Sequence, residues 1–211
     1  MPNASCPQCG GPVELPQRPE VFLVCPWCRS TLSRTAETLR RLGSVAELTP
    51  DVSPFQVGTR GRWQDRAFEL IGRIRRCYTD GQWNEWCLDF SSGDTAWLAE
   101  AQGQLFLSTP LDEWAAQLPD PRRLQPGHRL ELSGANWLVT DVREARIAGA
   151  EGYLPFNPSP EDRLLVDLVS SKGGFLHAEV FATHVHWYRG QVVNFDDLAF
   201  THLRELDGWR F

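Results

Sequence analysis

The stretch RAFELIGRIRRCYTDGQWNEWCLDF (66–90) decides the fold, because it predicts two strands joined by a turn. Apolar and polar residues alternate on both sides of the turn, which is typical of half-buried strands, and Asp-Gly favours a tight hairpin. We predict a three-residue loop of Thr79, Asp80 and Gly81, since a two-residue loop would divide the apolar set between two faces. The three-residue loop gathers that set on one face: Phe68, Leu70, Ile74, Tyr78, Trp86, Leu88 and Phe90.

The same register places Glu85 opposite Arg75 on the other, partly wet face of the hairpin. A cross-strand ion pair there contributes about 0.2–1 kcal/mol. A carboxyl on such a face lacks the burial that would raise its pKa for catalysis, so Glu85 is predicted to be an ion-pair partner. Trp83 shares this face with Arg73 and Arg75, where another part of the chain covers it or, alternatively, it anchors a binding partner.

Short alternating stretches separated by Gly, Asp, Asn and Pro continue to the end of the chain, and residues 54–211 are therefore predicted to form an antiparallel β-domain. Only 110–118 and 195–206 have helical periodicity within it, the second with Asn194 as its cap. The fold class is mainly β with few short helices.

An internal match suggests that this domain has two similar β-halves. GTRGRWQDRAFELIG (58–72) and GHRLELSGANWLVTD (127–141) share the spacing of their glycine and apolar residues at an offset of 69. The halves would cover 54–118 and 127–211, joined by the proline-rich stretch 119–127. Because any two alternating strands agree at period two, a chance match is the alternative.

Two CPxC pairs near the N-terminus predict one structural zinc ion in a ribbon covering residues 1–33. Their fifteen-residue separation is typical of zinc ribbons, and four thiolates with no open position favour structural zinc over iron or a redox CxxC. The predicted ligands are Cys6, Cys9, Cys25 and Cys28. Residues 34–53 follow as a helix and linker, because leucines recur at helical spacing within 33–48.

Composition places the chain among globular proteins without membrane insertion. The 211 residues have a net charge of −6, and the longest apolar runs are far below the ~18 residues that a membrane span needs. The N-terminus lacks the apolar stretch of a secretory signal, so the cytoplasm is the expected compartment and the thiols are expected to be reduced. Cys77 and Cys87 are expected on the outer hairpin face, four strand positions apart and too far for a disulfide.

No catalytic residue is predicted, and the chain is not expected to be an enzyme. Glycine-rich nucleotide loops and nucleophile elbows are absent from the sequence. His184 and His186 lie on one side of a strand with a spacing that metal sites use, but a third ligand is missing. They are therefore interpreted as ordinary strand histidines, with a second metal site as the alternative.

The motifs LIGRIR (70–75), GQWNEWCLDF (81–90) and GANWLVTDVREARIAGAEGYLPF (134–156) resemble a bacterial family of uncharacterised proteins, domain of unknown function 4178. The likeness covers roughly residues 55 to 200, and W-x-E-W, from Trp83 to Trp86, is its most specific element. Members of this family often have an N-terminal ribbon whose four cysteines match those found here. The resemblance implies a cytoplasmic accessory protein and supplies neither an activity nor catalytic residues.

Taken together, the sequence predicts a non-enzymatic adaptor with a protein partner, in which the ribbon is a docking head and the β-domain a second platform. One alternative is a nucleic-acid-binding protein that uses the ribbon and residues 29–76, where ten arginines stand against five acidic residues. The other alternative is a β-barrel ligand-binding protein or hydrolase that uses Glu85 or the histidines 184 and 186.

Overall fold

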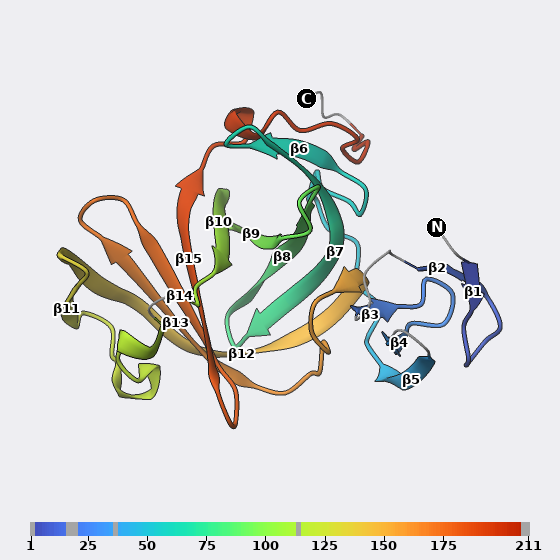
Figure 1. Cartoon of the computed structure of the whole chain (residues 1–211), viewed down its shortest axis with the longest axis horizontal. Helices are drawn as coiled ribbons and strands as arrows, with labels where there is room; N and C mark the ends of the chain where they lie inside the picture. Colours follow the sequence, from blue (N-terminus) through green and yellow to red (C-terminus); the bar gives the residue numbers. More distant parts are fainter. Residues whose placement is uncertain (1–2, 16–20, 36–37, 113–114, 208–211) are drawn as a thin grey trace.

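The computed structural model describes residues 3–15, 21–35, 38–112 and 115–207. Antiparallel strands dominate it, which confirms the predicted mainly β fold (Figure 1). The strands are β1 (Asn3–Ser5), β2 (Pro12–Glu14), β3 (Val21–Val24), β4 (Ser30–Arg34), β5 (Leu39–Ser44), β6 (Arg60–Trp63), β7 (Arg66–Tyr78), β8 (Gly81–Phe90), β9 (Thr95–Ala101), β10 (Gln104–Pro110), β11 (Arg129–Leu132), β12 (Ala135–Leu154), β13 (Arg163–Ser170), β14 (Phe175–Val180) and β15 (Val185–Val193).

Eight of these strands close on themselves and form what we call the strand ring. Their order is β7, β8, β9, β10, β15, β14, β13 and β12, and β12 pairs in turn with β7. All neighbours in the ring are antiparallel. Each ring strand therefore has its backbone hydrogen-bonding groups paired on two sides, and the ring encloses an interior toward which alternate side chains point.

The ring closes where β7 and β12 approach each other through a pair of glycines, Gly72 and Gly152. A Cβ at position 72 would lie 2.0 Å from the carbonyl oxygen of Tyr153, and a Cβ at position 152 would lie 2.3 Å from the carbonyl oxygen of Ile71. Gly152 also has a φ of +74°, which disfavours other residues. Only glycine lets these two strands lie so close.

The strands β6–β10 and β11–β15 repeat the same local design. The amide of Gly58 donates to the Leu70 carbonyl over 2.8 Å, and the amide of Gly127 donates to the Val139 carbonyl over 2.8 Å, at the predicted offset of 69. A β-bulge follows Leu70 in β7 and another follows Val139 in β12. The two sets of strands are built alike, while the division of the chain into domains stays a prediction.

Two apolar cores form, one mainly from each set of strands. The first core contains Phe55, Phe68, Leu70, Trp86, Leu88, Phe90, Ala96, Leu98, Leu105, Leu107, Val193 and Leu198. The second contains Leu111, Leu124, Trp137, Val139, Val166, Leu168, Leu176, Ala178 and Trp187. In β8, for example, Trp86 and Leu88 belong to the first core, while Trp83 and Glu85 point into the ring interior. Strand β8 therefore has core residues on one face and cavity residues on the other.

The predicted register of the β7–β8 hairpin is wrong. Tyr78 lies opposite Gly81, so the turn has two residues, and Ile74 rather than Arg75 lies opposite Glu85. The bulge after Leu70 explains the difference, because one extra residue in β7 reverses which side chains face the core. Leu70 stays in the first core opposite Leu88, whereas Ile74 and Glu85 turn toward the ring interior.

Three further predictions for local structure are also wrong. Of residues 33–48, 33–34 belong to β4 and 39–44 to β5 rather than to a helix, because backbone pairing of these two strands outweighs a weak helical periodicity. Residues 36–37 of this prediction lie outside the described residues. Within the described residues, 110–118 and 195–206 contain only the 3-10 turns η1 (Ala115–Gln117) and η3 (Asp196–Leu198), and a third 3-10 turn is η2 (Pro121–Arg123).

In the part of the chain that the structure describes, no helix has the length and apolarity that crossing a membrane requires.

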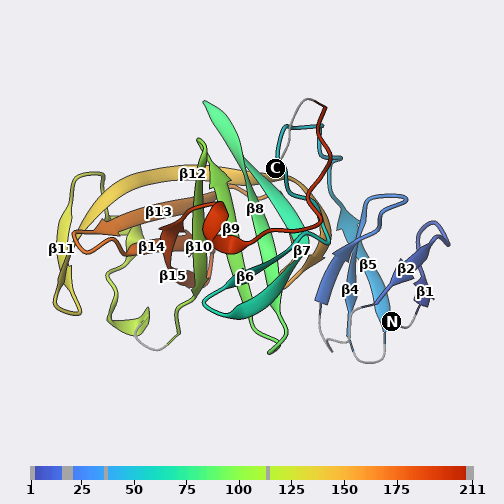
Figure 2. The same cartoon turned by 90° about the horizontal axis from the view of Figure 1, so that it is seen from above.

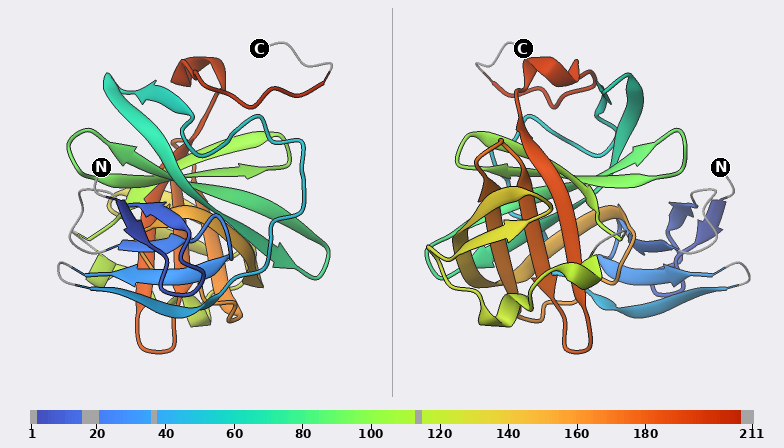
Figure 3. Two further views of the ribbon diagram at one scale, coloured as in Figure 1. Left: turned by 90° about the vertical axis from the view of Figure 1, so that its right-hand side faces the viewer. Right: turned by 60° about the vertical axis from the view of Figure 1, so that its left-hand side comes forward.

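The N-terminal ribbon joins the ring through β12. Strand β3 pairs with the end of β12 at Gly152 to Leu154, and β4 and β5 continue the sheet from there. Strands β1 and β2 form a separate two-stranded sheet. The ribbon lies at one end of the molecule, and β11 lies at the opposite end (Figure 2). Figure 3 shows β3–β5 beside the ring rather than inside it.

Candidate functional site

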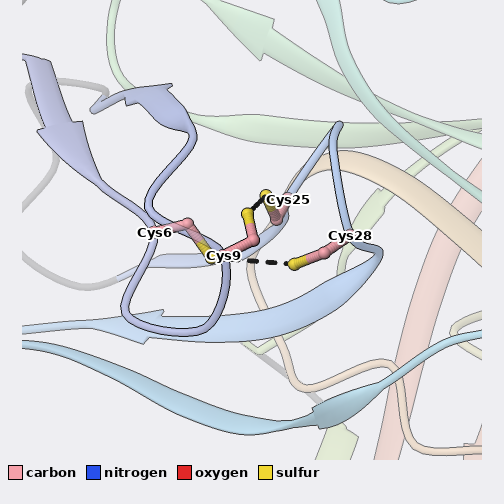
Figure 4. Close-up of side chains that lie close together, drawn as sticks. All are labelled: Cys6, Cys9, Cys25 and Cys28. Carbon is pink, nitrogen blue, oxygen red and sulfur yellow. Dashed lines mark hydrogen bonds between the residues drawn. The ribbon is translucent and has the colours of Figure 1, made fainter.

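Two hairpins bring the four predicted cysteine ligands together in the ribbon (Figure 4). In both hairpins the amide of the first cysteine, Cys6 or Cys25, donates to a carbonyl five residues on, at 2.8 and 2.9 Å. Gly10 and Arg29, each directly after the second cysteine of its pair, have φ values of +76° and +58°. The two turns thus have one shape and present their sulfurs to a common point.

The spacing of the sulfurs fits a tetrahedral metal site. The four Sγ atoms all lie within 4.8 Å of one another, with 3.7 Å between Cys6 and Cys28 and 3.9 Å between Cys9 and Cys25. Four sulfurs bound at about 2.3 Å to one tetrahedral ion would lie about 3.8 Å apart. Cys6 and Cys25 are buried, so the site belongs to the small core of the ribbon.

The second candidate site is a cavity of about 610 Å³ inside the strand ring. All eight ring strands contribute to its lining. Its exposed lining residues, Asp80, Gln82, Gln102, Gln104 and Thr140, mark the open end near the β7–β8 and β9–β10 turns. Its buried lining residues, Arg76, Trp97, Ser108, Leu165, Glu179 and Tyr188, mark the floor. A cavity of this size and enclosure is typical of small-molecule sites.

A network of buried charges forms this floor. The Nη2 of Arg76 and the Nη1 of Arg163 both donate to the same oxygen, Oε1 of Glu179, at 2.8 Å. Arg76 also donates through Nε to Glu85 at 3.2 Å, and Glu85 accepts a further bond from the indole of Trp83 at 2.8 Å. The side chains of Arg76 and Glu179 are only 2% and 3% exposed. Charges buried to this extent must form ion pairs and hydrogen bonds with one another.

The pKa values of this network follow from its ion pairs. Burial by itself would raise the pKa of Glu179, but Arg76 and Arg163 outweigh it, and the pKa of Glu179 is lowered. Burial would likewise lower the pKa of Arg76, but Glu85 and Glu179 raise it above its ordinary value. Glu179 and Arg76 are therefore both ionised at neutral pH.

Asp167 and His177 form a second polar pair on the cavity wall. Their atoms Oδ1 and Nδ1 lie 2.7 Å apart, between β13 and β14. Burial opposes protonation of His177, yet its hydrogen bond with Asp167 and the charge of that carboxylate raise the pKa of His177 above its ordinary value of 6.5. The imidazole is thus directed by one carboxylate, and it shares the face of β14 with Glu179.

Aromatic rings form much of the remaining wall. Phe175 lies between Phe106 and His177, with ring centres 5.2 and 6.4 Å away. Further rings in the lining are Tyr78, Trp83, Trp97, Phe156 and Tyr188. Burial raises the pKa of Tyr188, and nearby carboxylates raise it further, so its hydroxyl keeps its proton. The cavity therefore offers apolar faces beside a charged floor.

The residues predicted around Trp83 do not share one face. Trp83 lies opposite Arg76 and lines the cavity, whereas Arg73 and Arg75 point to the opposite face of β7. There both arginines bond to Asp51, Arg73 over 2.9 Å, and both are almost fully buried. Their predicted grouping with Trp83 is wrong because it depended on the wrong register, and a partner-binding role for these residues stays a prediction.

The predicted shared face of the two hairpin cysteines also changes with the register. Cys87 lies opposite Gly72, and Cys77 lies opposite Gln82, so the two thiols are on different faces. Cys87 is buried beneath the cavity with Ile74 and Trp97. The predicted shared outer face is wrong, although neither cysteine forms a disulfide, as expected.

His184 and His186 do lie together, with ring centres 4.6 Å apart and Phe181 stacked on His184 at 4.5 Å. The segment around them is a hairpin of β14 and β15 rather than one strand. Within the described residues, the cysteine cluster is the one group of three or more potential ligands near enough to hold a metal. The histidine alternative therefore still has no third ligand.

Many of the arginines between residues 29 and 76 are paired with carboxylates. Besides the buried Arg73, Arg75 and Arg76, four exposed or half-buried ones contact acidic residues: Arg29 with Glu47, Arg60 with Glu69, Arg62 with Asp65 and Arg66 with Asp94. These pairs do not favour an open basic surface, and nucleic-acid binding stays an untested alternative.

Sequence reasoning missed the principal cavity residues, namely Arg76, Asp167, His177, Glu179 and Tyr188. One signal was present. In LLVDLV (164–169) and FLHAEV (175–180), charged or titratable residues alternate with fully buried ones. Such alternation normally predicts a solvent-facing side, and only ring closure turns that side inward.

The fold and the two sites define an antiparallel β-protein with a closed strand ring, a charged internal cavity and a four-cysteine cluster. The chain belongs to the family Domain of unknown function (DUF4178), whose model matches residues 56–195. This match confirms the resemblance inferred from the W-x-E-W hairpin. Searches of curated proteins and of solved structures each returned no match.

Proposed function

We propose that this protein binds a small organic molecule in the cavity of the strand ring. The observation that carries the proposal is the floor, where Arg76 and Glu179 are almost completely buried at the end of a cavity with many aromatic rings in its walls. Burying charges is costly, and a chain selected for stability alone could replace them with apolar residues. Preorganised polar groups beside apolar walls are what small-molecule sites require.

Binding without catalysis fits these residues best. Glu85 and Glu179 are held in ion pairs with arginines, and the pKa of Glu179 is lowered, so Glu179 is a poor general acid. The expectation of a non-enzymatic protein is thus retained, now with a ligand in place of the adaptor role as the first proposal.

Dye binding tests the proposal directly. The uncharged dye N-phenyl-1-naphthylamine should fluoresce strongly with the wild-type protein, because its rings enter an apolar enclosure. Ala99→Trp fills the cavity from β9 and should abolish the signal. The matched control Ala67→Trp, at an exposed position outside the lining, should leave it unchanged. Equal fluorescence from the wild type and Ala99→Trp would overturn the proposal.

For the ribbon, we propose one structural zinc ion bound by the four cysteines. The sulfur spacing given above matches tetrahedral thiolate coordination, and four thiolates are the ligands that structural zinc prefers. Elemental analysis should find one zinc per chain in the wild type and none in Cys6→Ser. A metal that survives this substitution would instead support a second site, such as one at His184 and His186.

An adaptor role is a second candidate, favoured by Trp27 on the ribbon. This indole is 66% exposed, yet its Nε1 donates to the carbonyl of Pro12 at 2.9 Å and its ring lies against Gly11. A large aromatic held rigidly in solvent is typical of a binding anchor. If the ribbon docks to a protein partner in the cytoplasm, a purified complex should lose that partner on Trp27→Ala but keep it on Leu42→Ala, which alters another exposed apolar residue.

A further inference from the structure

We infer that the molecule bound in the cavity is a small organic cation, an ammonium or guanidinium group on an apolar body. The inference rests on the proposed function, because it assigns a ligand class to the same cavity. Three features of the lining support it: its charge, its unused carboxylate oxygens and its aromatic faces.

Carboxylates outnumber cations around the cavity. Asp80, Glu85, Asp141, Asp167 and Glu179 all line it, against the two arginines Arg76 and Arg143. Arg163 lies outside the lining but pairs with Glu179. Even with Arg163 and a protonated His177 counted, five carboxylates face four cations. The walls focus this excess of negative charge on the interior, where it attracts cations.

Two carboxylate oxygens remain available to a ligand. Both arginine bonds to Glu179 use Oε1, and the His177 bond to Asp167 uses Oδ1. In the described part of the chain, neither Glu179 Oε2 nor Asp167 Oδ2 accepts a hydrogen bond. Neither oxygen is fully buried. These oxygens therefore face accessible space, where an ammonium group could donate to them.

The aromatic faces suit a cation as well. Rings such as Trp97, Phe106 and Phe175 line the same cavity as the carboxylates. This protein already places cations on such faces, since Arg143 lies 4.4 Å from the ring centre of Tyr78 and Arg163 lies 4.3 Å from that of Phe181. A ligand cation would gain the same attraction, which strengthens when water is excluded.

An anionic ligand would find little to bind. Arg76 and Arg163 already donate to Glu85 and Glu179. Two guanidinium nitrogens of this floor that have no hydrogen bond, Arg76 Nη1 and Arg163 Nε, are fully buried, so a molecule in the cavity cannot reach them. An anion at this floor would lie beside carboxylate oxygens without hydrogen bonds, and the other guanidinium of the lining, Arg143, already pairs with Asp141, so anion binding there is unfavourable.

The test uses three probes that share a phenyl body and differ in charge: 2-phenylethylammonium, 2-phenylethanol and 3-phenylpropanoate. Each is titrated against wild-type protein loaded with N-phenyl-1-naphthylamine at neutral pH. We expect the ammonium to displace the dye at a concentration at least about tenfold lower than the alcohol, because a charge-assisted hydrogen bond adds to the binding of the phenyl group. The propanoate should displace it least of all.

Two charge-removing variants locate the interaction. Asp167→Asn keeps the shape of the side chain and should raise the concentration of 2-phenylethylammonium needed by about tenfold, while leaving that of the alcohol unchanged. Asp65→Asn removes a fully exposed carboxylate from the β6–β7 turn and should change neither. This control separates a bond inside the cavity from an effect of net charge.

The outcomes distinguish the inference from the proposed function. Displacement by propanoate at the same or lower concentrations than ammonium would overturn the cation while leaving a cavity that binds ligands. Failure of all three probes to displace the dye would also overturn the cation while leaving a cavity that binds ligands. An equal effect of Asp167→Asn on ammonium and alcohol would also overturn it. Failure of the dye itself to bind would instead remove the proposed function, and the inference with it.

Discussion

Replacing Glu179 with glutamine should strongly destabilise the fold, because this carboxylate is shared by two buried arginines. Arg76 and Arg163 each donate to it at 2.8 Å, and their side chains are 2% and 6% exposed. Arg76 keeps Glu85 as a partner, but Arg163 has no other carboxylate contact among the described residues. Removing one partner of a buried ion pair typically costs about 3–5 kcal/mol, so Glu179→Gln should lower the free energy of unfolding by about that amount.

Urea denaturation followed by tryptophan fluorescence measures this loss. The matched control is Glu69→Gln, because Glu69 contacts Arg60 at 3.0 Å, but these side chains are 42% and 59% exposed. The control should cost less than about 1 kcal/mol. Equal losses for Glu179→Gln and Glu69→Gln would refute the reasoning, since burial is the main difference between the two pairs.

Acid adds a second test of the same carboxylate. Burial favours the protonated form of Glu179, but Arg76 and Arg163 outweigh it, so the folded pKa lies below the ordinary value of 4.5. The stabilisation by ionised Glu179 is therefore present above about pH 4.5 and is lost as the pH falls through the folded pKa. The stability difference between the wild type and Glu179→Gln should persist from neutral pH down to that point and then shrink.

Two other substitutions test the ring closure and the histidine pair. Gly72→Ala places a Cβ 2.0 Å from the Tyr153 carbonyl oxygen and should cost about 1–3 kcal/mol, whereas Gly43→Ala meets no atom within 4 Å and should change the urea midpoint little. Asp167→Asn should lower the pKa of His177, which NMR titration of the imidazole measures; an unchanged pKa would show that Asp167 does not set it. Because that pKa is raised in the fold, the stabilisation it gives is complete below about pH 6.5 and is lost as the pH rises through the folded value. The stability difference between the wild type and Asp167→Asn should therefore be larger at about pH 6 than at about pH 9.

The cysteine cluster could be predicted because its information is local. Each pair, such as Cys6 and Cys9, lies within one tight turn, so the spacing alone determines that the sulfurs converge. The strands could be predicted for a similar reason, since alternation over a few residues reports a half-buried surface.

The hairpin register could not be predicted, because a β-bulge leaves no clear mark in the sequence. The bulge after Leu70 reverses the facing of every later residue in β7, so a rule that gathers all apolar residues on one face fails. Glu85 was consequently placed in partial contact with water, whereas it accepts from Arg76 on a cavity floor.

The cavity could not be predicted for a topological reason. Arg76 and Glu179 are 103 residues apart and meet only when β12 returns to β7 and closes the ring. Polar residues that alternate with buried ones on β14, such as His177, indicate a wet face, and the sequence does not say whether the water is bulk solvent or the contents of a cavity.

Ring closure also limits how copies of this protein could join one another. A strand with partners on both sides offers no open backbone edge to a second chain, and exposed edges are where sheets of different molecules fuse into aggregates. Among the described residues, the unpaired edges of the large sheet belong to short strands such as β5 and β11, and β6 is further bridged through Arg60 to Thr201. Self-association through the ring would therefore depend on side-chain contacts, and only these short edges could share strands with a second copy.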